Sequence, residues 1–187
     1  PVGFVFLPME YRLAETAVYR RIFVWVAVFV LGGILLSGRD CMEIKDYELV
    51  MFDVDGTIAD RNEDRLLPIA EDFFDLLHQW AAVANLPRLA LATNQGGVAL
   101  RLWMEDGGWG EPEKYPTLEA VQERLGTIQQ QIPLPITLYV AYAYQTQKTR
   151  EWAPVPIRFV GQPEWSRAWR KPNGGMLQQA MLDHGVK

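Results

Sequence analysis

One short apolar segment that ends in acidic residues constrains the fold of this chain more than any other feature. Residues 47–54, YELVMFDV, form an apolar-rich run, which is typical of a strand buried on both faces of a sheet. Apolar runs at 88–92 and 136–144 predict two further strands, and helical spacing is found at 66–82, 117–132 and 174–184. Strands that alternate with helices predict a parallel sheet with helices on its faces.

Length and composition indicate one globular domain. The chain has 187 residues, of which 49% are hydrophobic and 22% are charged, so it can bury a sizeable core. Its net charge of −5 disfavours binding to nucleic acid through bulk charge, although a local basic patch stays open. The single cysteine, Cys41, excludes an intrachain disulfide and an all-cysteine zinc site. We expect a cytoplasmic protein, with a membrane-anchored one as the alternative.

The N-terminal segment is expected to lie apart from this domain. Residues 22–36 are wholly apolar, and Arg12, Arg20 and Arg21 precede them. The basic flank suits a membrane anchor, but the run is shorter than the ~20 residues that a span needs. A buried core element and a stretch outside the working protein are the other interpretations. We favour the last, because Met42 is a natural start for a domain whose first strand begins near residue 47, and we divide the sequence into 1–41 and a domain at 42–187.

Polar residues follow the first strand where it ends. Asp53 and Asp55 alternate along an extended backbone, which directs both side chains to one side, and Gly56 permits a sharp exit. Such an acidic pocket suits a hard cation such as Mg²⁺. One carboxylate can attack phosphorus while the other transfers protons. Taken alone, however, two acids with this spacing are better explained as a solvated strand end.

Two other segments carry groups that suit a phosphate. Thr93 and Asn94 follow the second strand, where a hydroxyl and backbone N–H groups can hold phosphate oxygens. Lys171 precedes the last helix and can neutralise a phosphoryl group. Each signal is weak alone, but all fall where ligands bind in parallel sheets, at the carboxyl ends of the strands. Their joint order is therefore a much stronger signal.

Three motifs in this order resemble those of the haloacid-dehalogenase (HAD) superfamily: DVDGT at 53–57, LALATNQ at 89–95 and RKPNGGM at 170–176. The TNQ and RKPxxGM forms are similar to the subgroup of histidinol-phosphate, heptose-bisphosphate and polynucleotide 3′-phosphatases. The resemblance covers residues 46–184. It implies a three-layer α/β/α Rossmann-like sandwich with little or no cap domain. It also implies an Mg²⁺-dependent phosphomonoester hydrolase that acts through an aspartyl-phosphate.

The resemblance implies a role for each matched residue. Asp53 is expected to be the nucleophile and a ligand of Mg²⁺. Asp55 is expected to be the general acid and then the base, with its backbone carbonyl on the metal. Thr93 is expected to hold the phosphoryl oxygens and Lys171 to stabilise their negative charge. Contacts with substrate are expected from Gly56, Thr57 and Asn94.

The substrate class stays open between a phosphorylated small molecule and a polynucleotide end. Residues 145–170 contain neither cysteine nor histidine, so the zinc loop found in several relatives is not expected. Aromatic residues interleaved with basic ones in this segment suit stacking on bases. Packing of the loop against the domain is the interpretation that we favour for the tryptophans. The residues concerned are Trp152, Trp165, Trp169, Lys148, Arg150, Arg158 and Arg167.

One departure from the family pattern concerns the metal. The fourth motif, an acidic pair after a further strand, is expected beyond the last helix, and the sequence ends at Lys187 without it. Asp183 lies on that helix and is a poor substitute. We expect a C-terminally incomplete domain. A non-catalytic HAD-like fragment or binding module is the alternative, whereas a phospho-accepting regulatory domain is disfavoured because Asp55 supplies the acid/base that turnover needs.

Overall fold

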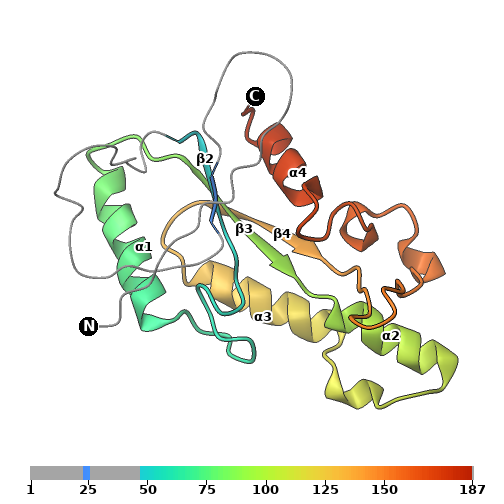
Figure 1. Ribbon diagram of the computed structural model, residues 1–187. Helices are drawn as coiled ribbons and strands as arrows, with labels where there is room; N and C mark the ends of the chain where they lie inside the picture. The colour runs from blue at the N-terminus through green and yellow to red at the C-terminus, as the bar shows by residue number, and fades with distance from the viewer. Residues whose placement is uncertain (1–22, 26–46, 187) are drawn as a thin grey trace.

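A computed structural model describes residues 23–25 and 47–186, drawn in colour in Figure 1. Four parallel strands form one sheet in the order β1-β2-β3-β4. They are β1 (Phe23–Trp25), β2 (Leu49–Phe52), β3 (Arg88–Asn94) and β4 (Ile136–Ala141). The predicted α/β class with a parallel sheet is confirmed, and no separate cap domain is present in the described part of the chain.

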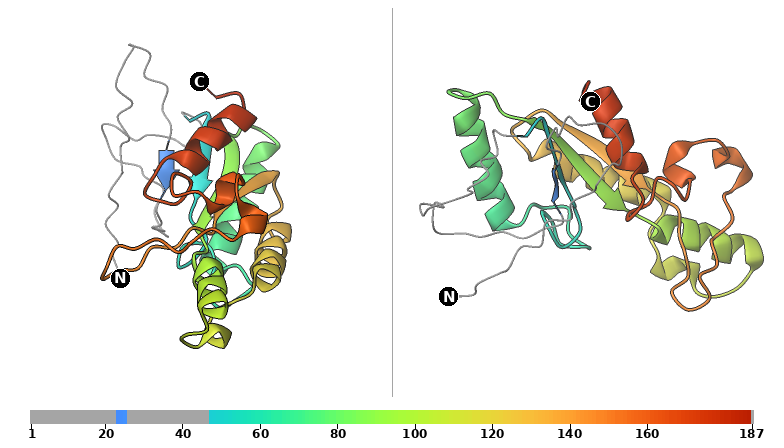
Figure 2. Two further views of the ribbon diagram at one scale, coloured as in Figure 1. Left: turned by 90° about the vertical axis from the view of Figure 1, so that its right-hand side faces the viewer. Right: turned by 45° about the horizontal axis from the view of Figure 1, so that its top comes forward.

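The alternation of side chains along β2 produces two cores, one on each face of the sheet. Val50 and Phe52 join the core under α1 (Pro68–Ala81) and α3 (Leu118–Gln130). Leu49 and Met51 join the core under α4 (Gly175–Asp183). Figure 2 shows α4 and α3 on opposite sides of the sheet. The helices therefore form the two outer layers of the expected three-layer sandwich.

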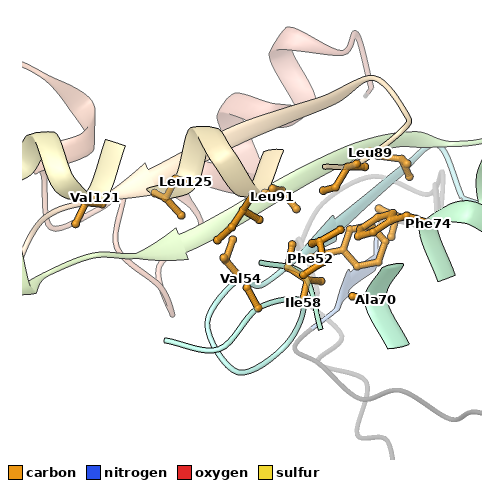
Figure 3. Close-up of a cluster of buried hydrophobic side chains, with 14 of the residues drawn as sticks. Phe52, Val54, Ile58, Ala70, Phe74, Leu89, Leu91, Val121 and Leu125 are labelled. Atoms are coloured by element: carbon orange, nitrogen blue, oxygen red, sulfur yellow. The ribbon is translucent and has the colours of Figure 1, made fainter. Parts of the chain in front are cut away.

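The first core extends from the helices to the turn that follows β2. Figure 3 shows Val54 and Ile58 of this turn against the side chains of the neighbouring strand and helices. Both residues have no exposed surface. On α1, Phe74 packs edge-on against Phe52, with ring centroids 5.4 Å apart. Because burying aromatic side chains contributes strongly to stability, this packing fixes where the segment after β2 can run.

The helices begin and end close to the predicted residues, but the inward face of α1 was predicted correctly only in part. The spacing of apolar residues at 66–82 predicts that Leu66, Ile69, Phe73, Leu77 and Trp80 lie on one inward side. Leu66 and Leu77 are buried, but Trp80 is 46% exposed and Phe73 is only partly buried. The buried residues are Ala70, Phe74 and Leu77. Their spacing of four and three residues is an equally regular helical pattern. Two adjacent phenylalanines made both faces apolar, so spacing alone could not choose between them.

On α3 the sequence pattern gave the inward face correctly. Thr117 accepts a hydrogen bond from the backbone N–H of Ala120 at 3.1 Å, as expected of an N-cap residue. Val121, Leu125 and Ile128 are buried, as expected from their spacing. The remaining elements are α2 (Gly97–Gly107) and three short 3₁₀ helices, η2 (Pro112–Lys114), η3 (Ile157–Phe159) and η4 (Pro163–Trp165).

Little of the N-terminal segment lies within the described residues. Within the apolar run 22–36 only the three residues of β1 are described, and they pair in parallel with β2. Among the residues that the structure describes, none of the helices has the length and apolar character of a membrane span. The division at residue 42 and the anchor interpretation stay predictions.

Candidate active site

Asp53 and Lys171 meet directly at the carboxyl ends of the strands. The Nζ atom of Lys171 lies 2.6 Å from Oδ1 of Asp53 and also donates to the backbone carbonyl of Ala92 at 2.8 Å. About a fifth of each side chain is exposed, 21% for Lys171 and 23% for Asp53. Since both groups keep access to solvent while facing each other, a phosphoryl group can approach the carboxylate beside a fixed positive charge.

Asp55 lies beside them, because its carboxylate contacts the residue that follows Ala92. The hydroxyl of Thr93, a fully buried residue, donates to Oδ2 of Asp55 at 3.2 Å. Gln95 Nε2 donates to the same oxygen at 2.5 Å and to Thr93 Oγ1 at 2.9 Å. On the other side, Arg124 Nη2 lies 2.9 Å from Oδ1 of Asp55. The carboxylate is therefore held by donors from β3, its following turn and α3.

The sharp turn after β2 needs a glycine. Gly56 has φ +76°, a left-handed conformation that side chains disfavour, and its N–H donates to Ala59 O at 2.8 Å. Thr57 is buried, and its N–H donates to Val54 O at 3.2 Å. Both N–H groups are thus used inside the turn. The contacts of Gly56 and Thr57 with substrate stay predictions.

Asn94 has a function in the structure that the sequence did not suggest. Its side-chain amide pairs with the backbone of Lys171 twice: Nδ2 donates to Lys171 O at 3.1 Å and Oδ1 accepts from Lys171 N at 3.0 Å. Nearby, Arg170 Nη1 donates to Ala143 O at 3.0 Å, and burial lowers the pKa of this guanidinium. These contacts join the third motif to the ends of β3 and β4. A role of the Asn94 N–H toward phosphate stays a prediction.

The donors near Asp53 suit a hard cation only in part. Carboxylate and carbonyl oxygens are the ligands that Mg²⁺ prefers, and Asp53 and Asp55 supply them. Within residues 23–25 and 47–186, however, no group of three or more acidic, histidine or cysteine side chains converges. Oδ1 of Asp53 faces a lysine, and both oxygens of Asp55 have donors. Of the expected ligands, these two aspartates are the ones that the described residues provide.

Asp183 lies away from these groups. It is the last residue of α4, where its carboxylate accepts from the hydroxyl of Tyr139 at 2.8 Å and from Gln179 Nε2 at 2.7 Å. It borders a cavity of about 760 Å³ beside β4 and α3, and none of the predicted site residues lines this cavity. Asp183 is therefore no substitute for a ligand beside Asp53.

The chain matches a family described as "Polynucleotide kinase 3 phosphatase" over residues 48–185. The chain belongs to this family. The match includes all three motifs, and it confirms the resemblance to HAD-like phosphatases, including the subgroup of polynucleotide 3′-phosphatases. Comparisons with curated proteins and with solved structures gave no significant match.

Two residues of the site, Gln95 and Arg124, were assigned no role from the sequence. Gln95 belongs to the second motif, and its spacing of two residues from Thr93 was a signal that both point to Asp55. Arg124 lies on α3, outside every motif. Arg124 was given no role from the sequence, because no local pattern connects it with Asp55. Only the packing of α3 beside the turn brings the two together.

Proposed function

We propose that this chain is a Mg²⁺-dependent phosphatase that removes the phosphate from the 3′ end of a polynucleotide. The observation that carries the proposal is the pairing of Asp53 with Lys171, beside Asp55, in a member of this family. The remaining support comes from the loop that precedes Lys171, from its charge and its aromatic side chains.

The proposed reaction has two steps. A carboxylate oxygen of Asp53 attacks phosphorus, the bond from phosphorus to the 3′ oxygen breaks, and Asp55 gives that oxygen a proton. Water then attacks the aspartyl-phosphate, Asp55 takes up the proton, and inorganic phosphate leaves. Lys171 stabilises the negative charge on the transferred group in both steps. Bound Mg²⁺, held by Asp53 and the carbonyl of Asp55, would supply further charge stabilisation.

The loop at 145–170 favours a polynucleotide over a small substrate. It carries five lysine or arginine residues and two glutamates, a net charge of +3 in a chain of net charge −5. Trp165 and Trp169 are buried, so these two pack the loop against the domain, as we favoured. Trp152 is only partly buried, and the guanidinium of Arg167 lies 5.3 Å from its ring centre. A basic surface that includes an aromatic ring suits a single-stranded nucleic acid.

The test uses the full chain and three substrates at equal concentration: a DNA oligonucleotide with a 3′-phosphate, the same oligonucleotide with a 5′-phosphate, and a sugar phosphate. We expect phosphate release from the 3′-phosphate alone, with Mg²⁺ and not with a chelator. Equal release from the 5′-phosphate or the sugar phosphate would contradict the substrate assignment. Turnover that survives the chelator would contradict the mechanism.

The absence of release from all three substrates would support the alternative of a non-catalytic, HAD-like binding module. One observation favours that alternative: among the described residues no third acidic side chain converges with Asp53 and Asp55. Binding of the 3′-phosphorylated oligonucleotide, measured by fluorescence anisotropy, would then distinguish a binding module from an inactive fragment.

A further inference from the structure

Helix α3 holds the segment that connects the Asp55 turn with α1. Arg124 Nε donates to Glu63 O at 2.8 Å, and Arg124 Nη2 donates to Asp60 O at 2.6 Å. Seven residues further along, Gln131 Nε2 donates to Asp64 O at 2.6 Å, and Gln131 Oε1 accepts from Leu66 N at 3.2 Å. Positions seven apart lie on one side of a helix. The side chains of Arg124 on α3 and of Gln131, the residue that caps the C-terminus of α3, thus hold the backbone of residues 60–66.

Of these two side chains, only that of Arg124 also contacts the carboxylate of Asp55. Arg124 Nη2 lies 2.9 Å from Oδ1 of Asp55, and the side chains of both residues are mostly buried, with 15% and 18% exposed. A planar guanidinium donates in fixed directions and keeps its charge, and such charge-assisted bonds are stronger than neutral ones. Because the same nitrogen contacts Asp60 O and Asp55, the segment and the carboxylate share one anchor.

We propose that Arg124 is a positioning residue for the reaction: it orients the Asp55 carboxylate for proton transfer and links that orientation to the placement of residues 60–66. The inference rests on the proposed function, in which Asp55 protonates the leaving oxygen. If Arg124 only held residues 60–66, its contact with Oδ1 of Asp55 would have no explanation. Arg124 Nε and both ends of the Gln131 amide already hold residues 63, 64 and 66 without contacting Asp55.

Orienting Asp55 and merely holding the backbone predict different effects of the leaving group on the rate of an Arg124 variant. A sugar hydroxyl is a poor leaving group, so its departure needs a proton from Asp55. A nitrophenol leaves as a stable anion and needs little help from an acid. If Arg124 orients Asp55, its loss affects the first substrate much more than the second. If Arg124 only holds the backbone, its loss lowers kcat on both substrates by the same factor.

The test compares Arg124→Gln, Arg124→Lys, Gln131→Ala and Asp55→Asn in the full chain. For each, kcat is measured on the 3′-phosphorylated oligonucleotide and on nitrophenyl phosphate. We expect Arg124→Gln to lower kcat on the oligonucleotide by about tenfold more than on nitrophenyl phosphate, below the roughly 10²–10⁴-fold worth of the acid itself. Arg124→Lys retains the charge and should restore part of this loss. Gln131 holds the same segment at residues 64 and 66 without contacting Asp55, so Gln131→Ala should change both rates by one factor.

An unchanged ratio of the two rates in Arg124→Gln, as in Gln131→Ala, would overturn the proposal while leaving the phosphatase function standing. If Arg124→Gln does not fold, Arg124→Lys provides the ratio, and equal loss on both substrates overturns the proposal in the same way. A wild-type chain that turns over neither substrate would refute the proposed function, and the role of Arg124 with it.

Discussion

The ammonium group of Lys171 lies 2.6 Å from a carboxylate oxygen of Asp53, although the two residues are more than a hundred positions apart in the sequence. A second bond, to the carbonyl of Ala92, fixes the lysine at the end of β3. The Asn94 amide holds its backbone from the same strand. The positive charge is therefore in place before a substrate arrives, which is the arrangement that electrostatic stabilisation of a phosphoryl group requires.

Replacing this lysine is expected to slow turnover strongly. Lys171→Ala should lower kcat by roughly 10²–10³-fold, the loss typical of removing one preorganised donor of this kind. The measurement is the rate of phosphate release from nitrophenyl phosphate. Lys114→Ala is the matched control, because Lys114 is exposed and its ammonium group pairs with Glu111 at 2.7 Å and not with Asp53. Equal rates for the two variants would contradict the role of Lys171.

Two neighbouring glycines in the third motif should respond very differently to alanine. A Cβ atom on Gly175 would lie 2.6 Å from Ala168 O and 2.8 Å from the Cα of Trp169, so backbone would have to move. On Gly174 the nearest atom would be Gln178 Nε2, at 3.9 Å. We expect Gly175→Ala to lower the free energy of unfolding by about 1–3 kcal/mol, and Gly174→Ala to leave it unchanged or slightly higher.

Urea denaturation of both variants measures this difference. Lys171 lies between Ala168 and Gly175 in the sequence, so a backbone shift in Gly175→Ala should displace it and also lower phosphatase activity. Equal unfolding free energies for the two alanine variants would mean that the approach of Gly175 to residue 168 is not a constraint on the fold.

Asp183 is expected to make stability depend on acidic pH. Hydrogen bonds from Gln179 and then from Tyr139 lower the pKa of this carboxyl below its ordinary value of 3.8. A depressed pKa means that the folded state prefers the ionised form. The resulting stability is present above the ordinary value and is lost as the pH falls through the lower folded value. Asp183→Asn should therefore lose less stability on acidification.

The measurement is the free energy of unfolding in urea, from neutral pH down to about pH 3, for wild type and Asp183→Asn. Gln178→Ala, on the same helix, is a control that leaves both hydrogen bonds to Asp183 in place. If the free energy of unfolding falls with pH as steeply in Asp183→Asn as in wild type, the Asp183 carboxyl does not contribute to the pH dependence of stability.

A chain that starts at Met42 is expected to fold cooperatively. The described side chains of the two cores extend from Tyr47 to Val186, so they remain complete in the shorter chain. The deletion removes β1, whose three residues pair with β2, so some loss of stability is expected. A single sigmoidal unfolding transition, followed by circular dichroism, is the predicted result. The absence of a transition would mean that residues 1–41 are needed for the fold.

Sequence patterns predicted the fold well where one periodicity dominated. The spacing of Val121, Leu125 and Ile128 identified the buried face of α3. A glycine at 185 predicts the end of the last helix, and Gly185, with φ +66°, does follow the C-cap residue of α4. The inward face of α1 was predicted correctly at Leu77 but wrongly at Phe73 and Trp80, because Phe73 and Phe74 offered two equally apolar faces. Both rings contact Phe52 edge-on, yet only Phe74 is fully buried, and this difference comes from tertiary packing that local spacing does not contain.

The candidate site was predictable to the extent that it is built from motifs. Asp53, Asp55, Thr93 and Lys171 follow strands or precede a helix, and a parallel sheet brings such positions to one edge. The structure brings all four together. Arg124 was missed because it reaches Asp55 from the middle of a helix, through tertiary packing alone. The sequence assigned the backbone N–H of Asn94 to phosphate, which stays a prediction, and gave no role to its side-chain amide, which holds the backbone of Lys171.

The most direct test of the account is to trap the phosphorylated enzyme. The full chain is mixed with an oligonucleotide whose 3′-phosphate is radiolabelled, in the presence of Mg²⁺, and quenched with acid during turnover. Peptide mapping then locates the label. We predict an acid-stable, base-labile acyl phosphate on Asp53 in wild type and none in Asp53→Asn, which should also lose nearly all activity. Label on any other residue, or phosphate release with no labelled protein at any time point, would contradict the account.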